Sequence, residues 1–208
     1  MDTHELKLIA LTGGPGAGKT EVLEVARKSF CDHVVILPEA ASILFGGGFR
    51  RKETMPGKKA SQRATFHVQR EQEKMVEGEN RACIVVCDRG ILDDVAYCPT
   101  AEDLFWKELG TRREIELSRY VAVIHLRTPA AEQGYNLGNP VRIETAVQAQ
   151  AIDENIFKAW EGHTNRVVIE SASDFLGKAA KAVEAIRKWI PHCCLSHPIR
   201  GLERDTAT

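Results

Sequence analysis

The sequence predicts an α/β protein built on a five-stranded parallel sheet with helices on both faces. Five short runs rich in β-branched and aliphatic residues recur along the chain, and helical patterns separate them. None of the runs alternates cleanly between apolar and polar residues, and near-continuous apolar runs are typical of parallel strands that are buried on both faces. Strands that alternate with helices indicate βαβ units and therefore a parallel sheet.

The expected elements can be placed from these patterns. Strands are expected at Lys7–Leu11, His33–Leu37, Ala82–Cys87, Tyr120–Leu126 and Arg166–Ile169. Helices are expected at Thr20–Phe30, Ala60–Glu79, Val141–Trp160 and Phe175–Ile190. About 44 residues separate the second strand from the third, and about 32 separate the third from the fourth. Because a βαβ crossover needs only about a dozen residues, we expect extra helical structure over the carboxyl ends of these strands.

Composition excludes several classes of protein. The 208 residues include 28 basic and 29 acidic side chains, for a net charge of −1, whereas a general nucleic-acid binder needs a basic surplus. The longest apolar run has six residues (Ala82–Cys87), far short of the roughly 20 that span a membrane. The amino terminus has no apolar signal core, and six sparse cysteines do not suggest a disulfide framework. We therefore expect a cytoplasmic protein, with one domain at residues 1–190 and a tail at 191–208.

The strongest motif lies between the first expected strand and the first expected helix. The segment Gly13–Thr20 reads GGPGAGKT and fits the phosphate-binding pattern G-x-x-x-x-G-K-[ST]. Glycines allow successive backbone N–H groups to turn inward around a phosphate, and the helix that follows adds the positive end of its dipole. In this pattern Lys19 reaches the β- and γ-phosphates, and the hydroxyl of Thr20 is a ligand for Mg²⁺. The nucleotide-binding residues predicted here are Gly13, Gly14, Pro15, Gly16, Ala17, Gly18, Lys19 and Thr20.

Charged residues follow the second, third and fourth strands. Asp88, at the end of the third strand, is expected beside the phosphate loop, where it would hold Mg²⁺ or simply end the strand. Arg89 would aim a bidentate donor at a phosphate. Glu39 would either accept the proton of an attacking hydroxyl or face the next helix dipole. Arg142, and less clearly Arg127, would supply positive charge from a lid or else remain solvated.

These residues resemble those of a known family. The matching segments are TGGPGAGKT (Thr12–Thr20), LPEAA (Leu37–Ala41), CDRGILDD (Cys87–Asp94) and RIETAVQAQAIDENIFKAW (Arg142–Trp160). They resemble the P-loop kinases of the nucleoside and nucleotide kinase group, which includes thymidylate kinase. More closely, they resemble a small AAA-domain-like ATPase family related to the ribosylnicotinamide kinase domain of the bacterial NAD regulator.

The resemblance implies a P-loop NTPase fold with strand order 2-3-1-4-5. It also implies a carboxylate, here Glu39, that acts near the acceptor hydroxyl, and an Asp-Arg pair, here Asp88 and Arg89, that binds Mg²⁺ or an acceptor phosphate. An acceptor-covering insertion is expected at about 40–80 and a lid at about 127–145.

The helix within the insertion carries the expected acceptor-binding residues. They form an arginine, aromatic and amide set at helical spacing: Arg63, Phe66, Gln69 and Arg70. Such a set would hold a phosphate and stack on or hydrogen-bond a base. A solvated helix face explains the two arginines equally well.

The combined features predict a kinase-type enzyme. The leading hypothesis is transfer of the γ-phosphoryl group of ATP, with Mg²⁺, to a small nucleoside- or nucleotide-like acceptor. The catalytic set predicted for it is Lys19, Glu39, Asp88, Arg89 and Arg142. The alternative is a nucleotide-binding switch or regulatory module that hydrolyses slowly. The absence of an Asn-Lys-x-Asp element favours ATP. The resemblance to the kinase group implies a base loop, here Ser171–Phe175, that reads bases through its backbone and could also accept GTP.

One further cluster of potential metal ligands lies in the tail. His192, Cys193, Cys194 and His197 offer four donor groups, but adjacent cysteines lack the spacing of zinc sites. We therefore expect no metal site within this segment.

Overall fold

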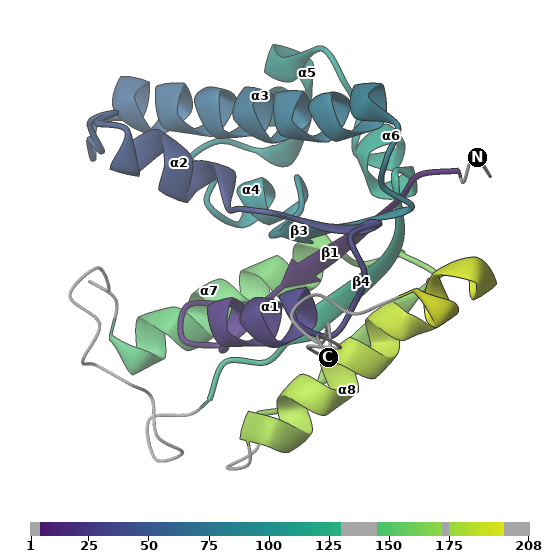
Figure 1. Ribbon diagram of the computed structural model, residues 1–208. Coiled ribbons are helices and arrows are strands. Elements are labelled where there is room, and N and C mark those ends of the chain that lie inside the picture. The colour runs from purple at the N-terminus through teal and green to yellow at the C-terminus, as the bar shows by residue number, and fades with distance from the viewer. Residues whose placement is uncertain (1–4, 130–144, 172–174, 198–208) are drawn as a thin grey trace.

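A computed structural model describes residues 5–129, 145–171 and 175–197, which form a sheet flanked by helices (Figure 1). The strands are β1 (Lys7–Thr12), β2 (Val34–Leu37), β3 (Ile84–Asp88), β4 (Tyr120–Leu126) and β5 (Arg166–Ile169). All paired neighbours run parallel, in the order β2-β3-β1-β4-β5. The predicted fold class and strand order are confirmed, and each strand lies within two residues of its expected limits.

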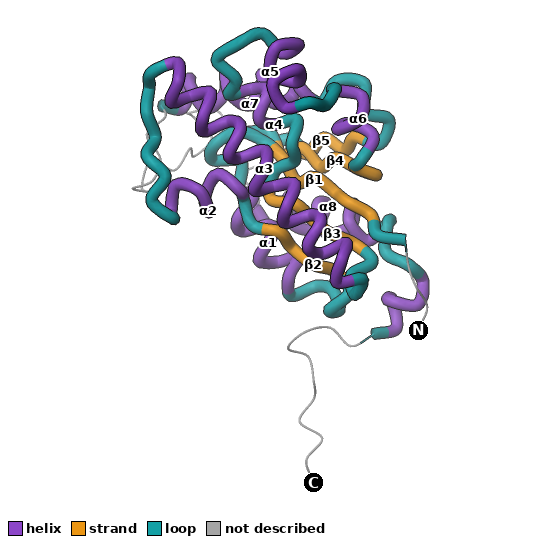
Figure 2. The backbone as a smooth tube through the Cα atoms, turned by 90° about the horizontal axis from the view of Figure 1, so that it is seen from above, coloured by secondary structure: helices purple, strands orange, loops and turns teal. Residues whose placement is uncertain are grey.

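Helices cover both faces of the sheet. They are α1 (Lys19–Arg27), α2 (Ala40–Gly46), α3 (Met55–Glu79), α4 (Asp93–Ala96), α5 (Glu102–Leu109), α6 (Arg113–Ser118), α7 (Ala146–Ala159), α8 (Phe175–Arg187) and a 3-10 helix, η2 (His192–Ser196). Buried residues of α1 and α8 pack on one face, and those of α3, α5 and α7 pack on the other. Figure 2 looks down on the face that α3 crosses.

Successive side chains of a strand contribute alternately to these two apolar layers. Ile9 and Leu11 belong to the layer beneath α1 and α8, whereas Leu8 and Ala10 belong to the layer beneath α3 and α7. Because successive side chains of a strand point to opposite faces, a continuous apolar run serves both layers. No helix in the described part of the chain is long and apolar enough to cross a membrane.

The helix limits differ from expectation where capping decides them. Helix α3 begins at Met55, five residues before its expected start, because Thr54 caps it by accepting from the Gly57 N–H at 3.3 Å. A proline in the first turn is compatible with a helix, since its missing N–H has no partner there. Helix α7 begins only after Thr145, which forms a capping box with Gln148. The short helices α2, α4, α5 and α6 provide the extra helical structure expected in the two long intervals.

Two predicted segments are only partly described. Of the expected lid at about 127–145, residues 130–144 lie outside the described residues. Of the expected tail at 191–208, His192–Ser196 forms η2, and Cys194 within it is buried against the domain. The proposed division into a domain and a tail therefore stays a prediction.

The strand register gathers three chain segments at one edge of the sheet. Leu11 pairs with Asp88 across β1 and β3, and Leu37 pairs with Cys87 across β2 and β3. The loop after β1, the residues after β2 and the end of β3 therefore meet at the carboxyl edge of the sheet, where parallel α/β folds bind their ligands.

Candidate functional site

The phosphate-binding loop spans the turn from β1 into α1. Gly13, Gly16 and Gly18 have φ values of 139°, 77° and 86°, in the region that side chains rarely adopt. At Gly13 a Cβ atom would also lie 2.1 Å from the carbonyl oxygen of Leu126. Glycine is therefore required for this loop to pass so close to β4 and to begin α1.

Two charged side chains that the sequence analysis did not select hold this loop. Asp153 of α7 accepts a hydrogen bond from the Gly14 N–H at 2.8 Å. The buried ammonium of Lys178 in α8 donates to the Ala17 carbonyl at 2.8 Å and the Arg127 carbonyl at 2.9 Å. The signal that could have revealed Asp153 is a carboxylate within the buried face of α7, between Ala149 and Ile156.

Lys19 points back along the loop. Its Nζ donates to the carbonyl oxygens of Gly13 at 2.8 Å and Gly14 at 3.1 Å. Burial, reinforced by the positive charge of Arg89, lowers the pKa of Lys19 to about 8. A triphosphate bound at the loop would replace these neutral partners with anionic ones.

Asp88 has the features of a Mg²⁺ ligand. Its Oδ1 is buried and has no hydrogen-bond partner among the described residues. Burial raises the pKa of the Asp88 carboxyl, and the nearby Lys19 only partly opposes this effect. A bound cation would satisfy the unpaired oxygen, and the hydroxyl of Thr20, which is exposed at the start of α1, suits the same ion.

Arg89 connects three parts of the site. Its Nε donates to Glu39 Oε1 at 2.6 Å, and its Nη1 donates to Asp93 Oδ2 and the Gly13 carbonyl, both at 3.2 Å. Its φ of 71° is left-handed, a strain of about 1–3 kcal/mol that surrounding contacts must offset. The guanidinium also lies 5.6 Å from the ring centre of Tyr97.

Glu39 occupies the N-cap position of α2 without using its side chain to cap the helix. Instead, its carboxylate accepts hydrogen bonds from Arg89 and from Ser42 Oγ at 2.5 Å. Burial tends to raise the pKa of Glu39, but Arg89, Ser42 and Lys19 together bring it below its ordinary value. The side chain is thus an ionised carboxylate at neutral pH, directed toward the centre of the site.

Asp93 is the most enclosed acid of the site, with a 1% exposed surface. It accepts from Thr12 Oγ1 at 2.7 and 2.6 Å and from Trp160 Nε1 at 2.6 Å, in addition to Arg89. These bonds join the end of β1, the start of α4 and the end of α7. Asp93 therefore fixes Arg89 in place.

A pocket lies beside these charges, between α2, α3 and α4, and is named here the α2–α3 pocket. About 80 Å³ of it is enclosed space for water-sized particles, and the space rises to about 570 Å³ when the solvent-open mouth is counted. The lining residues are Glu39, Ala40, Ala41, Phe45, Ser61, Gln62, Thr65, Gln69, Arg89, Gly90, Ile91, Asp93, Asp94 and Tyr97. One wall is apolar, α3 supplies a wall of hydroxyl and amide groups, and one end is charged.

Three groups in the α2–α3 pocket suit a polar ligand. Ser61 Oγ and Gln62 Oε1 are buried without a hydrogen-bond partner among the described residues. Asp94 also lines the pocket, and burial together with the neighbouring charge of Asp93 raises its pKa well above the ordinary value. Unpaired buried polar atoms are costly and uncommon, so a ligand or an ordered water that hydrogen-bonds these atoms would stabilise the pocket.

The structure divides the expected acceptor-binding set. Gln69 lines the α2–α3 pocket, whereas Phe66 is buried in the layer between α3 and the sheet. Arg63 pairs with Glu108 and Arg70 pairs with Glu116, each at 3.5 Å. The α3 residues that line the pocket are Ser61, Gln62, Thr65 and Gln69. Three of the four expected residues thus lie off the pocket wall.

The remaining candidates lie around the α7 side of the loop. Arg127 forms ion pairs with Asp153 and Glu154, each at 3.2 Å, so in this arrangement it holds α7. Arg142 lies outside the described residues, as do residues 172–174 of the expected base loop.

The fold and the loop together define a P-loop nucleoside triphosphatase fold of the nucleotide kinase type. A family model described as an AAA domain matches residues 8–175, so the chain belongs to that AAA-domain family. No curated protein matches the chain. The more specific resemblance to the ribosylnicotinamide kinase domain stays a prediction.

Solved structures agree on the fold. Thymidylate kinase from Ehrlichia chaffeensis aligns with a TM-score of 0.59 at 14% identity, covering 86% of this chain and 97% of that one. Thymidylate kinase from Candida albicans aligns with a TM-score of 0.63 at 11% identity, covering 88% and 91%. At these identities the likeness concerns the arrangement of the backbone.

Proposed function

We propose that the chain is an ATP-dependent phosphotransferase that acts on a small nucleoside- or nucleotide-like acceptor. The observation that supports this most directly is the α2–α3 pocket, which shares Glu39 and Arg89 with the phosphate-binding end of the sheet. A second pocket beside a phosphate loop, with polar groups on one wall and charges at one end, suits a reaction between two bound molecules. A switch that only binds and hydrolyses a nucleotide has no need of it.

In the proposed reaction the loop amides and Lys19 bind the β- and γ-phosphates of ATP. Asp88 and Thr20 would hold Mg²⁺, which supplies positive charge to the phosphates when bound. An acceptor oxygen forms a bond to the γ-phosphorus as the bond to the β-γ bridging oxygen breaks, and ADP leaves. Glu39 takes the proton of the attacking hydroxyl. Arg89 keeps Glu39 ionised and oriented, and we propose Arg142 as a further source of charge.

A specific observation favours a second candidate, a regulatory module with slow hydrolysis. The 2.6 Å pair between Glu39 and Arg89 neutralises both groups, and a lowered pKa makes Glu39 a weaker base. On this hypothesis the pair is structural, and no acceptor accelerates the loss of the γ-phosphate.

A binding screen followed by one substitution separates the two candidates. Nucleotides and candidate acceptors are first screened by thermal shift, since a ligand at 100 times its dissociation constant stabilises by about 2.7 kcal/mol. For any acceptor found, Glu39→Gln should bind ATP normally and lose phosphoryl transfer by about a hundredfold or more. Glu71→Gln makes the same change from carboxylate to amide at an exposed position of α3 and is the matched control. Near-parental turnover by Glu39→Gln would contradict the proposed role of Glu39. A failure of every acceptor to accelerate ATP hydrolysis would favour the regulatory module.

A further inference from the structure

Four potential metal ligands from distant parts of the chain meet at the amino end of β2. Cys31 and His33 lie in the loop between α1 and β2, and Cys194 and His197 come from η2 and the residue that follows it. One donor atom of each residue lies within 4.8 Å of all the others. The four residues are named here the Cys₂His₂ cluster.

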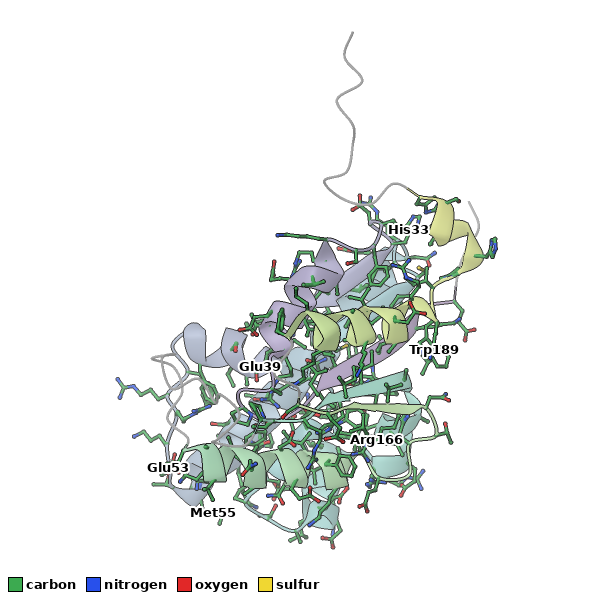
Figure 3. The ribbon with its side chains drawn as sticks, turned by 90° about the horizontal axis from the view of Figure 1, so that it is seen from below. His33, Glu39, Glu53, Met55, Arg166 and Trp189 are labelled. Carbon is green, nitrogen blue, oxygen red and sulfur yellow. The ribbon has the colours of Figure 1, made fainter. Side chains whose placement is uncertain are left out.

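The cluster is separate from the candidate nucleotide site. His33 precedes the first residue of β2, whereas Glu39 follows the last, so the two lie at opposite edges of the parallel sheet. Figure 3 shows His33 beside the C-terminal segment and Glu39 well away from it. A ligand at the cluster therefore serves neither the phosphate loop nor the α2–α3 pocket.

The distances within the cluster suit a tetrahedral ion. Zinc binds cysteine sulfur at about 2.3 Å and histidine nitrogen at about 2.0–2.1 Å, so a sulfur and a nitrogen on one tetrahedral ion lie about 3.6 Å apart. Cys194 Sγ lies 3.4 Å from His33 Nδ1. The rings of His33 and His197 meet edge to face, with centroids 4.9 Å apart. No two donor atoms lie more than 4.8 Å apart, so the side chains would have to move by about 1 Å to close around one ion.

A small cavity lies against the cluster, and two of the four residues reach solvent. This cavity has about 30 Å³, and its lining includes three of the four cluster residues but not His33: Ser29, Phe30, Cys31, Arg187, Ile190, Cys194 and His197. About 10–15 Å³ measured in this way accommodates one water-sized particle. The two cysteines are buried, whereas both histidines are partly exposed and open the cluster to solvent.

The chemistry of the donors selects the ion. Two thiolates and two neutral imidazoles balance the charge of a divalent cation, so closing the cluster buries no net charge. Thiolate and imidazole ligands in a tetrahedral set are typical of zinc. The backbone around His33 is also fixed, since its carbonyl accepts from the Cys83 N–H at 2.8 Å and from Cys83 Sγ at 3.4 Å.

We propose that Cys31, His33, Cys194 and His197 form a structural Zn²⁺ site that fastens the C-terminal segment to the start of β2. The ligand pairs have the spacings Cys-x-His and Cys-x-x-His, and about 160 residues separate them. Binding converts both thiols to thiolates and releases their protons. A cross-link between such distant segments restricts the unfolded chain strongly, which is why metals stabilise folds in this way.

The proposal is tested on the full chain, purified without a metal-binding tag. Elemental analysis should find one zinc per chain, and the metal-free protein should take up Co²⁺ with the absorption bands of tetrahedral thiolate coordination. Cys31→Ser and His197→Ala should each lower the zinc affinity by about tenfold or more. Cys98→Ser and His67→Ala change the same residue types away from the cluster and should keep the parental zinc content. A zinc chelator should lower the melting temperature of the parent but not that of His197→Ala.

Other outcomes would overturn the proposal. One is a reduced protein that binds neither zinc nor Co²⁺, and another is parental zinc content in both cluster variants. Cys83 Sγ lies 3.6 Å from Cys194 Sγ, so a disulfide is the competing chemistry. If the mass of the protein is lower by two hydrogens and the reduced protein takes up no zinc, the two cysteines form a disulfide and the proposed metal site is wrong. Because His197→Ala is read out by metal content and melting temperature, its result is independent of the proposed kinase function.

Discussion

The pH dependence of nucleotide binding should report the state of Lys19. Burial and Arg89 lower the pKa of this lysine to about 8 in the nucleotide-free protein. With that value, roughly nine in ten side chains carry the proton at pH 7 and roughly one in ten at pH 9. A bound triphosphate replaces the carbonyl partners of Nζ with anionic oxygens and restores the proton. ATP affinity should therefore fall by about tenfold between pH 7 and pH 9.

Calorimetry in buffers of different ionisation enthalpy measures the accompanying proton uptake directly. Uptake per ATP bound should rise from about 0.1 at pH 7 to about 0.8 at pH 8.5. Lys19→Arg is the matched control, because arginine keeps its charge throughout this range. The ATP affinity of Lys19→Arg is expected to be lower than that of the parent, but it should not show the same fall above pH 8. An uptake that stays near zero at pH 8.5 in the parent would refute the reasoning.

The lowered pKa also has a consequence for folding. Because the unfolded chain holds this proton up to the ordinary lysine value of 10.5, it binds more protons than the folded chain between about pH 8 and that value. The contribution of Lys19 to the free energy of unfolding should therefore increase with pH across this window. Urea titrations at pH 8 and pH 10 measure the free energy of unfolding, and it should rise with pH in the parent relative to Lys19→Arg.

Three further substitutions, two of them paired with a control, test other parts of the site. Asp88→Asn should weaken ATP binding much more with Mg²⁺ than with EDTA, and equal losses in both conditions would make the carboxylate structural. Gly90→Ala should destabilise by about 1–3 kcal/mol in urea unfolding, because the new methyl would lie 2.6 Å from a buried tryptophan ring. Gly78→Ala, which meets nothing within 4 Å, should instead stabilise by about 0.5–1 kcal/mol. Asp153→Ala should cost about 1–3 kcal/mol and weaken ATP binding, since it leaves the loop N–H without its acceptor. Glu154→Ala should change both measurements much less, because its side chain is 46% exposed.

The local features of this protein could be predicted because they are written in contiguous residues. The phosphate loop is one unbroken segment, Gly13–Thr20, and its glycines and lysine are required by the backbone and the phosphates themselves. Strand limits followed from apolar runs, and a parallel sheet places every strand end at the same edge. Glu39, Asp88 and Arg89 therefore came together from their positions after strands alone.

The face of α3 that borders the α2–α3 pocket required the tertiary structure. Adjacent helix residues differ by about 100° in direction, so Gln62 lines the pocket while Arg63 reaches toward Glu108. Both faces carry polar residues, and the sequence pattern does not distinguish the face that covers a ligand from one that meets a neighbouring helix.

Contacts between distant residues were decided by the tertiary structure as well. Asp153 is 139 positions from the Gly14 N–H that it holds, and Cys194 is 161 positions from His33. Within the C-terminal segment the adjacent cysteines lack the spacing of a zinc site, and only the packing of η2 against the loop before β2 brings Cys31 and His33 to Cys194 and His197. The residues that follow each strand could be identified from the sequence, because apolar runs mark where the strands end. Which helix face, and which end of the chain, packs against those residues depends on tertiary packing, because such contacts have no periodicity or spacing along the chain.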